Sequence, residues 1–208
     1  MKKILFVAGA LGLFLSSCDK DWVRCEKCDV AKTTTSYFPL TQGTYWIYEH
    51  TNLDTNGVET VTSIDSSYVS NDTVIGGKTY TKVFGNITNS PGFTLLRDSA
   101  DCVVKTSGTI IFSASNYTDT LSKWSVPGYL EVSNMMAQFP EVVVVPAGSF
   151  LAKDNKGTAL FTNPSYPWPN PRYTHNYYSK GVGLIREISF FTSSPNYVTR
   201  RLVRYHIE

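Results

Sequence analysis

The chain has 208 residues, of which 42% are hydrophobic and 17% charged, and its formal net charge is +2 at pH 7. Lys2 and Lys3 carry this excess, because without them the 19 basic residues fall to 17 and equal the 17 acidic ones. A neutral chain without a basic stripe gives no electrostatic footprint for nucleic acid and is not a polybasic membrane binder.

The first eighteen residues have the pattern of an export signal. A basic start is followed by an apolar run over residues 4–15, which is too short for a bilayer-spanning helix of about twenty residues. The run ends in Leu15-Ser16-Ser17-Cys18, which resembles the lipobox of bacterial lipoproteins. The resemblance implies removal of residues 1–17 as a signal peptide and acylation of Cys18, with the membrane as a partner through two or three acyl chains. The alternative is an ordinary secretory signal with a chance cysteine, which Leu15 disfavours.

Residues 18–36 are expected to form a flexible lipidated tether, because they are polar and have no periodic apolar pattern. Asp19-Lys20-Asp21 resembles the acidic run that sends lipoproteins of one Gram-negative group to the outer face of the outer membrane. The resemblance implies a lipid-anchored protein of the outer membrane that faces the cell surface, with the periplasmic face as the alternative.

Cys25 and Cys28 lie in this tether with two residues between them. In an oxidising compartment they are expected to form a disulfide or to remain idle thiols. The spacing also occurs in zinc sites and redox sites. Tetrahedral zinc requires four ligands, and the sequence offers no second pair, whereas a redox pair would begin a helix after a strand. No metal or cofactor site is predicted.

From residue 37 to residue 208 the chain is punctuated like a single antiparallel β domain. Asn56-Gly57 and Gly76-Gly77 fit tight hairpin turns, and Pro91-Gly92 fits a type II turn. Runs rich in β-branched and aromatic residues predict the following strands: Thr44–Thr51, Val58–Val69, Lys78–Thr88, Phe93–Asp98, Cys102–Thr106 and Thr109–Ser115.

One helix is expected at most in the second half. Only Tyr129–Phe139 has room for it, with Met135, Met136 and Phe139 on its buried side. Val142–Val145 is continuously apolar, which predicts a strand buried on both faces.

The last run, Arg201–Ile207, alternates in character and predicts a half-buried strand. One face would carry Val203, Tyr205 and Ile207, and the other would carry Leu202, Arg204 and His206. The predicted fold is therefore mainly β, a single antiparallel sheet with at most one or two short helices.

Three segments resemble signatures of a large group of bacterial envelope lipoproteins of unassigned function: Tyr37–Tyr48 (YFPLTQGTYWIY), Val145–Phe150 (VPAGSF) and Tyr178–Ile185 (YSKGVGLI). The resemblance implies a strongly curved antiparallel sheet, a half-barrel or open barrel like that of lipoprotein carriers, and it transfers no catalytic residue. The segments also have a structural reading. Gly43, Gly148, Gly181 and Gly183 would permit turns or close backbone approach, and Trp46, Phe150 and Leu184 would lie in the core.

Catalytic signatures are absent from the sequence. It contains no Gly-x-Ser-x-Gly elbow, His-Glu-x-x-His pair or phosphate-cradling glycine loop. His50, His175 and His206 are far apart in the chain, and structural or solvent-facing roles are expected for them. Residues 52–57 imitate the start of a calcium loop, but Ser63 stands where a bidentate glutamate belongs, so a hairpin turn is expected there.

The segment 161–178 holds four prolines among its aromatic residues. Such a stiffened loop can display aromatic faces that stack on sugars or grip apolar ligands. A ligand-binding site at Tyr166, Trp168 and Tyr173 is therefore a hypothesis. The alternative is a loop folded back so that its rings cover the sheet.

Three Asp-Thr/Ser-aliphatic triplets resemble the O-glycosylation acceptor of the same bacterial group. They place candidate modified hydroxyls at Thr73, Ser99 and Thr120. The alternative is chance, because turns are rich in Asp and Thr.

The sequence favours a non-enzymatic lipoprotein of the cell envelope that binds a ligand, which could be a glycan or a lipid, or an envelope-protein partner. The alternative is a structural or adhesive component of a surface assembly, which would bury an exposed sheet edge against a partner strand. An enzyme without a recognisable motif is the third class, and it would require convergent acid and base groups in a pocket.

Overall fold

The structure is a computed structural model that describes residues 36–85, 92–99 and 101–208. The signal peptide, Cys18, Cys25 and Cys28 lie outside these residues. Every regular element in the described ranges is a β-strand, and none of these ranges contains a helix long and apolar enough to cross a bilayer.

The strands form one antiparallel sheet. They are β1 (Tyr45–Leu53), β2 (Glu59–Ile75), β3 (Lys78–Phe84), β4 (Phe93–Ser99), β5 (Cys102–Lys105), β6 (Ile110–Ser113), β7 (Ser122–Val126), β8 (Leu130–Met136), β9 (Glu141–Val145), β10 (Gly148–Phe161), β11 (Arg172–Ser179), β12 (Gly183–Phe190) and β13 (Tyr197–His206).

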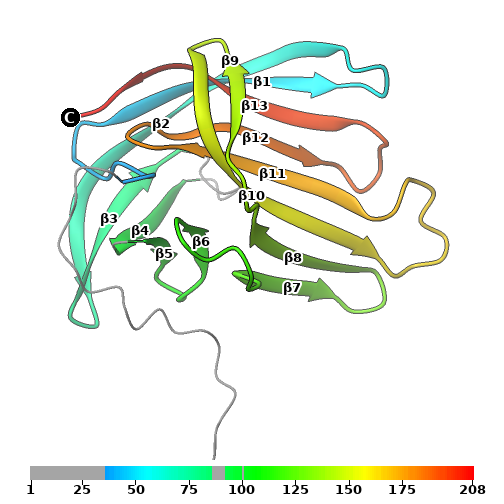
Figure 1. Ribbon diagram of the computed structural model, residues 1–208, viewed down its shortest axis with the longest axis horizontal. Coiled ribbons are helices and arrows are strands. Elements are labelled where there is room, and N and C mark those ends of the chain that lie inside the picture. Colours follow the sequence, from blue (N-terminus) through cyan, green and yellow to red (C-terminus); the bar gives the residue numbers. More distant parts are fainter. Residues whose placement is uncertain (1–35, 86–91, 100) are drawn as a thin grey trace, which may run out of the picture.

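The order of the strands explains why the sheet curls. It runs β6-β5-β4-β3-β2-β1-β13-β12-β11-β10-β8-β7, with β9 paired to β10 outside this path. The two edge strands, β6 and β7, are joined only by residues 114–121, which reach at most about 3.5 Å per residue. The edges must therefore approach each other, and the sheet bends until it nearly closes into a barrel (Figure 1).

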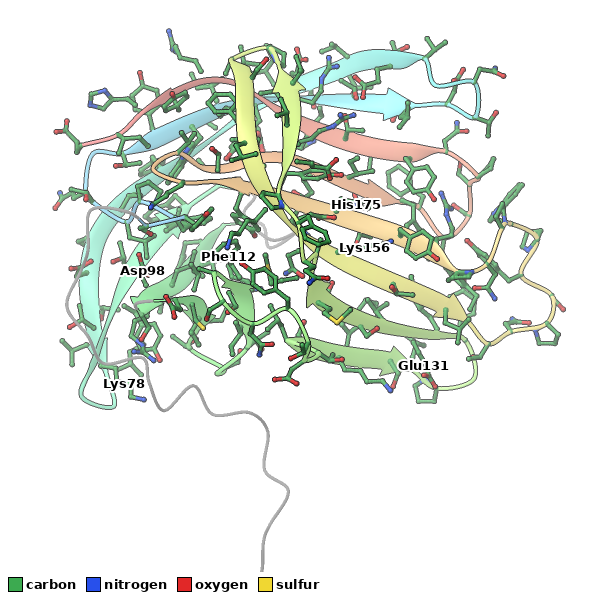
Figure 2. All side chains as sticks on the ribbon, viewed as in Figure 1. Lys78, Asp98, Phe112, Glu131, Lys156 and His175 are labelled. Carbon is green, nitrogen blue, oxygen red and sulfur yellow. The ribbon has the colours of Figure 1, made fainter. Side chains whose placement is uncertain are left out.

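Side chains join the β6 edge to the inner face of the opposite wall. Asn155 Nδ2 on β10 donates to the Ile111 carbonyl at 2.7 Å, and Lys153 Nζ donates to the Ala114 carbonyl at 2.6 Å. The rings of Phe112 and Tyr178 lie 5.0 Å apart between their centroids. Phe112, from β6, is labelled near the centre of the view in Figure 2. Both polar and aromatic contacts thus hold the curl.

The main core lies inside this curl and unites two of the segments singled out in the sequence. Trp46 Nε1 donates to the Val182 carbonyl at 2.6 Å, and the Tyr48 hydroxyl donates to the Leu184 carbonyl at 2.8 Å. Gly183 has a φ of +104°, and a Cβ there would lie 3.2 Å from Trp46 Nε1. The core reading of Trp46 and Leu184 is confirmed, as is the need for glycine at 183.

The other core and turn residues predicted from the three signature segments also have the expected burial or backbone conformation. Phe150 is half-buried against the core, and Gly43, Gly148 and Gly181 all have positive φ angles. Gly57, Gly76 and Gly77 also have positive φ angles, which confirms the two tight hairpin turns.

The strands predicted for residues 44 to 115 are confirmed, with differences at their ends. β2 extends to Ile75, farther than expected, because it continues to the Gly76-Gly77 turn. β3 ends at Phe84, before Gly85, whose φ is +102° and whose site leaves no room for a side chain.

The expected helix at 129–139 is wrong. Leu130–Met136 forms β8, which pairs with β7 and with β10. Met136 is buried, whereas Met135 is half-exposed and Phe139 is exposed. Two neighbouring methionines on opposite faces fit the period of a strand, which tertiary pairing has imposed on a segment with weak local preference.

The prediction that Val142–Val145 is buried on both faces is also wrong. Val143 and Val145 are each 6% exposed, whereas Val142 and Val144 are 68% and 66% exposed. The β9–β10 hairpin lies across β12 and β13, so that only one of its faces is covered (Figure 1).

The strict alternation expected for residues 201–207 does not hold. A register shift between Ile47 and Tyr48 pairs Ile47 with Arg204 and Tyr48 with Leu202, so that Val203 has no residue opposite it on β1. Leu202 is therefore fully buried, while Tyr205 is partly exposed and Ile207 packs against the core. A bulge of this kind exchanges the two faces of a strand, and the hydrophobic pattern does not reveal it.

Candidate functional site

A row of polar residues crosses the inner face of four neighbouring strands. Glu187 on β12 lies opposite Arg200 on β13, Arg200 lies opposite His50 on β1, and His50 lies opposite Ser63 on β2. Directly opposed residues in an antiparallel ladder point to the same face. The row therefore places these side chains together, on the same face as Tyr48.

This row forms the floor of a pocket with a volume of about 460 Å³. Nine of its twelve lining residues are polar. Besides the four residues of the row, the lining consists of Thr51, Asn52, Thr62, Ser189, Thr199, Phe190, Phe191 and Val198. The volume lies in the range of about 300–1,000 Å³ that is typical of ligand pockets, although the polar share of the lining is unusually high.

Arg200 is the most constrained charge in the pocket and is only 3% exposed. Its Nε donates to Asp65 Oδ1 at 3.2 Å, and its Nη2 donates to Ser67 Oγ at 2.9 Å. The guanidinium carbon lies 3.7 Å from the centroid of the Tyr48 ring, which is a cation–π contact, while Nη1 has no hydrogen-bond partner. The guanidinium is thus held rigidly, while the two N–H groups of its buried Nη1 have no partner.

One carboxylate pairs with Arg200, and a second lies opposite it on the neighbouring strand. Asp65 Oδ2 lies 3.2 Å from Arg200 Nη2 and 3.2 Å from His50 Nε2, so it joins the arginine to the histidine. Glu187 is also buried, at 6% exposure. The structure therefore supplies His50 with a carboxylate that its position in the sequence could not indicate.

The low polarity around this network appears in the behaviour of its tyrosines. Burial raises the pKa of Tyr48 well above its usual value of 10, while Arg200 lowers it and Asp65 and Glu187 raise it further. Burial also raises the pKa of Tyr178, and Glu187 adds to this effect. The core next to Arg200, which contains these two rings, is thus well shielded from water.

The pocket does not form a metal centre. In the described part of the chain, no group of three or more His, Cys, Asp or Glu side chains is arranged to hold a metal ion. Arg200 in the centre of the network also disfavours a cation there. The chemistry that the arrangement offers is hydrogen bonding to a polar ligand.

The three aromatic residues proposed from the sequence do not line this pocket. Tyr166 folds back onto Phe161, with ring centroids 3.5 Å apart and planes 3° from parallel. Trp168 is half-buried, and its Nε1 is buried without a hydrogen-bond partner. Tyr173 is 38% exposed and lies beneath Lys156 Nζ, 4.2 Å from its ring centroid. Ligand binding at these residues stays a prediction.

One arginine connects the proline-rich loop to the rim of the pocket. Arg172 is 1% exposed and donates to the carbonyls of four residues in the β12–β13 turn, which are Phe191, Ser194, Pro195 and Asn196. Its guanidinium also lies over the rings of Phe190 and Tyr197. Because Phe190 and Phe191 line the pocket, Arg172 fixes the shape of its rim.

The three candidate glycosylation hydroxyls have different exposures. Thr120 is exposed in the segment between β6 and β7, Thr73 is half-buried in β2, and Ser99 is 1% exposed at the end of β4. Of the three, Thr120 is the one that a modifying enzyme could reach in the folded domain. Modification at each of them stays a prediction.

The other two histidines lie away from the pocket. His175 Nδ1 lies 2.7 Å from Asp154 Oδ2 on the outer face, beside Lys156 in the neighbouring strand (Figure 2). His206 Nε2 lies 2.9 Å from Glu208 near the end of the chain.

No protein-family profile matches the sequence, and no curated protein matches it. Two solved structures are similar in fold. One, from Bacteroides fragilis, is provisionally described as an exported protein with a YmcC-like fold; the TM-score is 0.48 at 16% identity, over 81% of this chain and 98% of the other. The second, from Parabacteroides distasonis, is provisionally described as a lipoprotein; the TM-score is 0.46 at 14% identity, over 84% of this chain and 100% of the other. Likenesses of this size do not assign an activity.

Proposed function

We propose that this protein is a lipid-anchored protein of the bacterial outer membrane that binds a small polar ligand, without catalysis, in the pocket of β1, β2, β12 and β13. The observation that carries the proposal is the buried Arg200 network at the floor of an open pocket. Charged groups are costly to bury, and a stable sheet could be built from apolar residues instead. A few polar and charged groups that converge in a pocket are characteristic of binding sites.

The two candidate binding sites, the proline-rich loop and the inner pocket, differ in accessibility. The proline-rich loop presents rings that are partly covered by one another, as Tyr166 is by Phe161. The inner pocket presents exposed polar residues at its mouth, Asn52, Thr62 and Ser63, above the buried network. This arrangement favours the inner pocket as the binding site.

Thermal unfolding in the presence of a small-molecule panel tests ligand binding. The panel contains neutral saccharides, uronic acids, amino acids and fatty acids. A ligand at a hundred times its Kd adds about 2.7 kcal/mol to the stability and raises the Tm. We expect at least one class to raise the Tm of the wild type and of Phe139→Ala, an exposed site outside the pocket, but not of Asn52→Ala. A panel without effect, or an effect that persists in Asn52→Ala, would contradict the proposal.

The location is tested separately on intact cells. The lipobox-like sequence at Cys18 and the acidic residues after it support an anchor in the outer membrane that faces outward. A protease that cannot cross the outer membrane should therefore remove the domain from whole cells while a periplasmic control protein stays intact. A domain that is protected under the same conditions would instead face the periplasm.

A component of a surface assembly is the second candidate, and the β9–β10 hairpin favours it. Among the described strands, β9 pairs only with β10, and the hairpin exposes Val142, Val144 and Leu151. An open edge beside apolar side chains can accept a strand from another chain. If this candidate is correct, the purified domain should self-associate in light scattering, and Val144→Lys should abolish the association.

A further inference from the structure

We infer that the ligand of the inner pocket is a neutral saccharide. The inference rests on the proposed function and specifies the class of ligand. It follows from the charge balance of the pocket, from the kinds of hydrogen-bonding group along its wall, and from the aromatic side chains at its rim.

The charges argue against an ionic ligand. Arg200 is already engaged by Asp65 and Ser67, and the carboxylate of Glu187 lines the floor of the pocket. An anion would meet the Glu187 carboxylate and an arginine that is already paired with Asp65. A cation would meet the guanidinium at the centre of the network. Unlike an ion, a neutral molecule with many polar groups does not disturb this balance.

The lining offers donors and acceptors together. Hydroxyl side chains on Thr62, Ser63 and Ser189 line the pocket, whereas the hydroxyls of Thr51 and Thr199 are buried and bond to each other at 2.6 Å. A hydroxyl can both donate and accept, as can the amide of Asn52. Vicinal hydroxyl groups of a sugar, which also both donate and accept, match such a wall. A fatty acyl chain would bring no hydrogen-bonding group to the exposed Asn52 and Ser63 at the mouth of the pocket.

The rim supplies the contact that a sugar ring requires on its apolar face. Phe191 is 57% exposed and Phe190 is half-buried, and both line the pocket. An exposed aromatic ring beside polar groups can stack on the C–H face of a pyranose. The position of this rim is fixed, because Arg172 holds the Phe191 carbonyl and packs on the Phe190 ring.

Isothermal titration calorimetry of the full domain tests the inference. The probes are trisaccharides of glucose, mannose, galactose, xylose and N-acetylglucosamine, with galacturonic acid oligomers, amino acids and a fatty acid as comparators. We expect at least one neutral trisaccharide to bind, and Phe191→Ala and Asn52→Ala each to weaken it about tenfold. Both residues are exposed, and the contacts of Phe191 with Arg172 involve only its backbone, so neither change should prevent folding. Phe139→Ala is the matched control and should bind like the wild type.

The outcomes separate this inference from the proposed function. Binding of a comparator instead of the saccharides, weakened by the same two variants, would overturn the saccharide class and leave the pocket as a binding site. Saccharide binding that neither variant weakens would place the sugar elsewhere and overturn the inference. No binding of any probe would overturn both.

Discussion

Arg200 and Arg201 are adjacent in the sequence and lie on opposite faces of β13. Arg200 faces inward, is 3% exposed, and pairs with Asp65 and Ser67 over the Tyr48 ring. Arg201 faces outward, is partly exposed, and forms ion pairs with Glu49 and Glu59.

The same residue type therefore serves two purposes. The outer ion pairs resemble surface salt bridges, which contribute little and are screened by salt. The inner arginine pairs with a carboxylate in a shielded site. Removal of one partner there leaves an unpaired buried charge, which destabilises the folded state. We infer that the inner network positions the residues of the pocket, whereas the outer ion pairs add little to the stability of the sheet.

Replacement of Arg200 should give the largest effect. Arg200→Met should lower the free energy of unfolding by about 3–5 kcal/mol, because Asp65 would lose its cation and Glu187 would lose the positive charge opposite it on the ladder. Urea denaturation measures the loss as a shift of the unfolding midpoint, provided that the slope m of the free energy against urea concentration is unchanged. A double variant with Asp65→Asn should recover part of the loss. A loss below about 1 kcal/mol in the single variant would remove the contrast between the two arginines.

Tyr48, which lies under Arg200, should make the stability of the domain depend on pH. Burial raises the pKa of Tyr48 in the folded state above the unfolded value of 10. Above a pH of about 10 the unfolded chain therefore loses this proton more readily than the folded protein does, and the free energy of unfolding falls as the pH rises. Tyr48→Phe should cost about 1–2 kcal/mol at neutral pH, since the Leu184 carbonyl loses its donor. Its alkaline loss of stability should also be shallower than that of the wild type. Urea titrations between neutral pH and pH of about 11 measure both effects, and identical alkaline slopes would contradict the account.

Arg201 should give a smaller effect. Arg201→Ala is expected to cost at most about 1 kcal/mol, and the cost should decrease as salt is added, since the pairs with Glu49 and Glu59 are partly exposed. The measurement is urea denaturation at low and high ionic strength. A cost equal to that of Arg200→Met would show that the faces do not differ as described.

Phe191 should have the smallest effect on stability. Phe191→Ala should change the free energy of unfolding by less than about 0.5 kcal/mol, because the side chain is 57% exposed. A loss of ligand affinity without a loss of stability would assign the residue to binding, while a large loss of stability would assign it to the fold.

Much of the fold followed from local pattern. Hairpin glycines such as Gly57 and Gly77 and the β-branched runs located the strands of the first half, because turn geometry and alternation are local properties. The errors arose where tertiary pairing overrides the pattern. β10 imposed a strand on residues 130–136, and the bulge at Val203 exchanged the faces of β13.

The candidate site could not be derived from the sequence in the same way. Arg200 and Asp65 are 135 residues apart, and nothing in their local sequence shows that they meet. Arg200 also stands next to a second arginine, and the local pattern does not distinguish the buried residue from the partly exposed one. The aromatic residues around Tyr166 form a recognisable pattern because they lie close together in the sequence, whereas the residues of the pocket come from four strands.

A crystal structure of the domain, grown with the saccharide that calorimetry identifies, would locate the binding site directly. The sugar is expected in the inner pocket, with a hydroxyl near Asn52 and a ring against Phe191. A saturating sugar that instead occupies the loop at Tyr166, Trp168 and Tyr173, with the inner pocket holding only water, would show that the inner pocket is not the binding site.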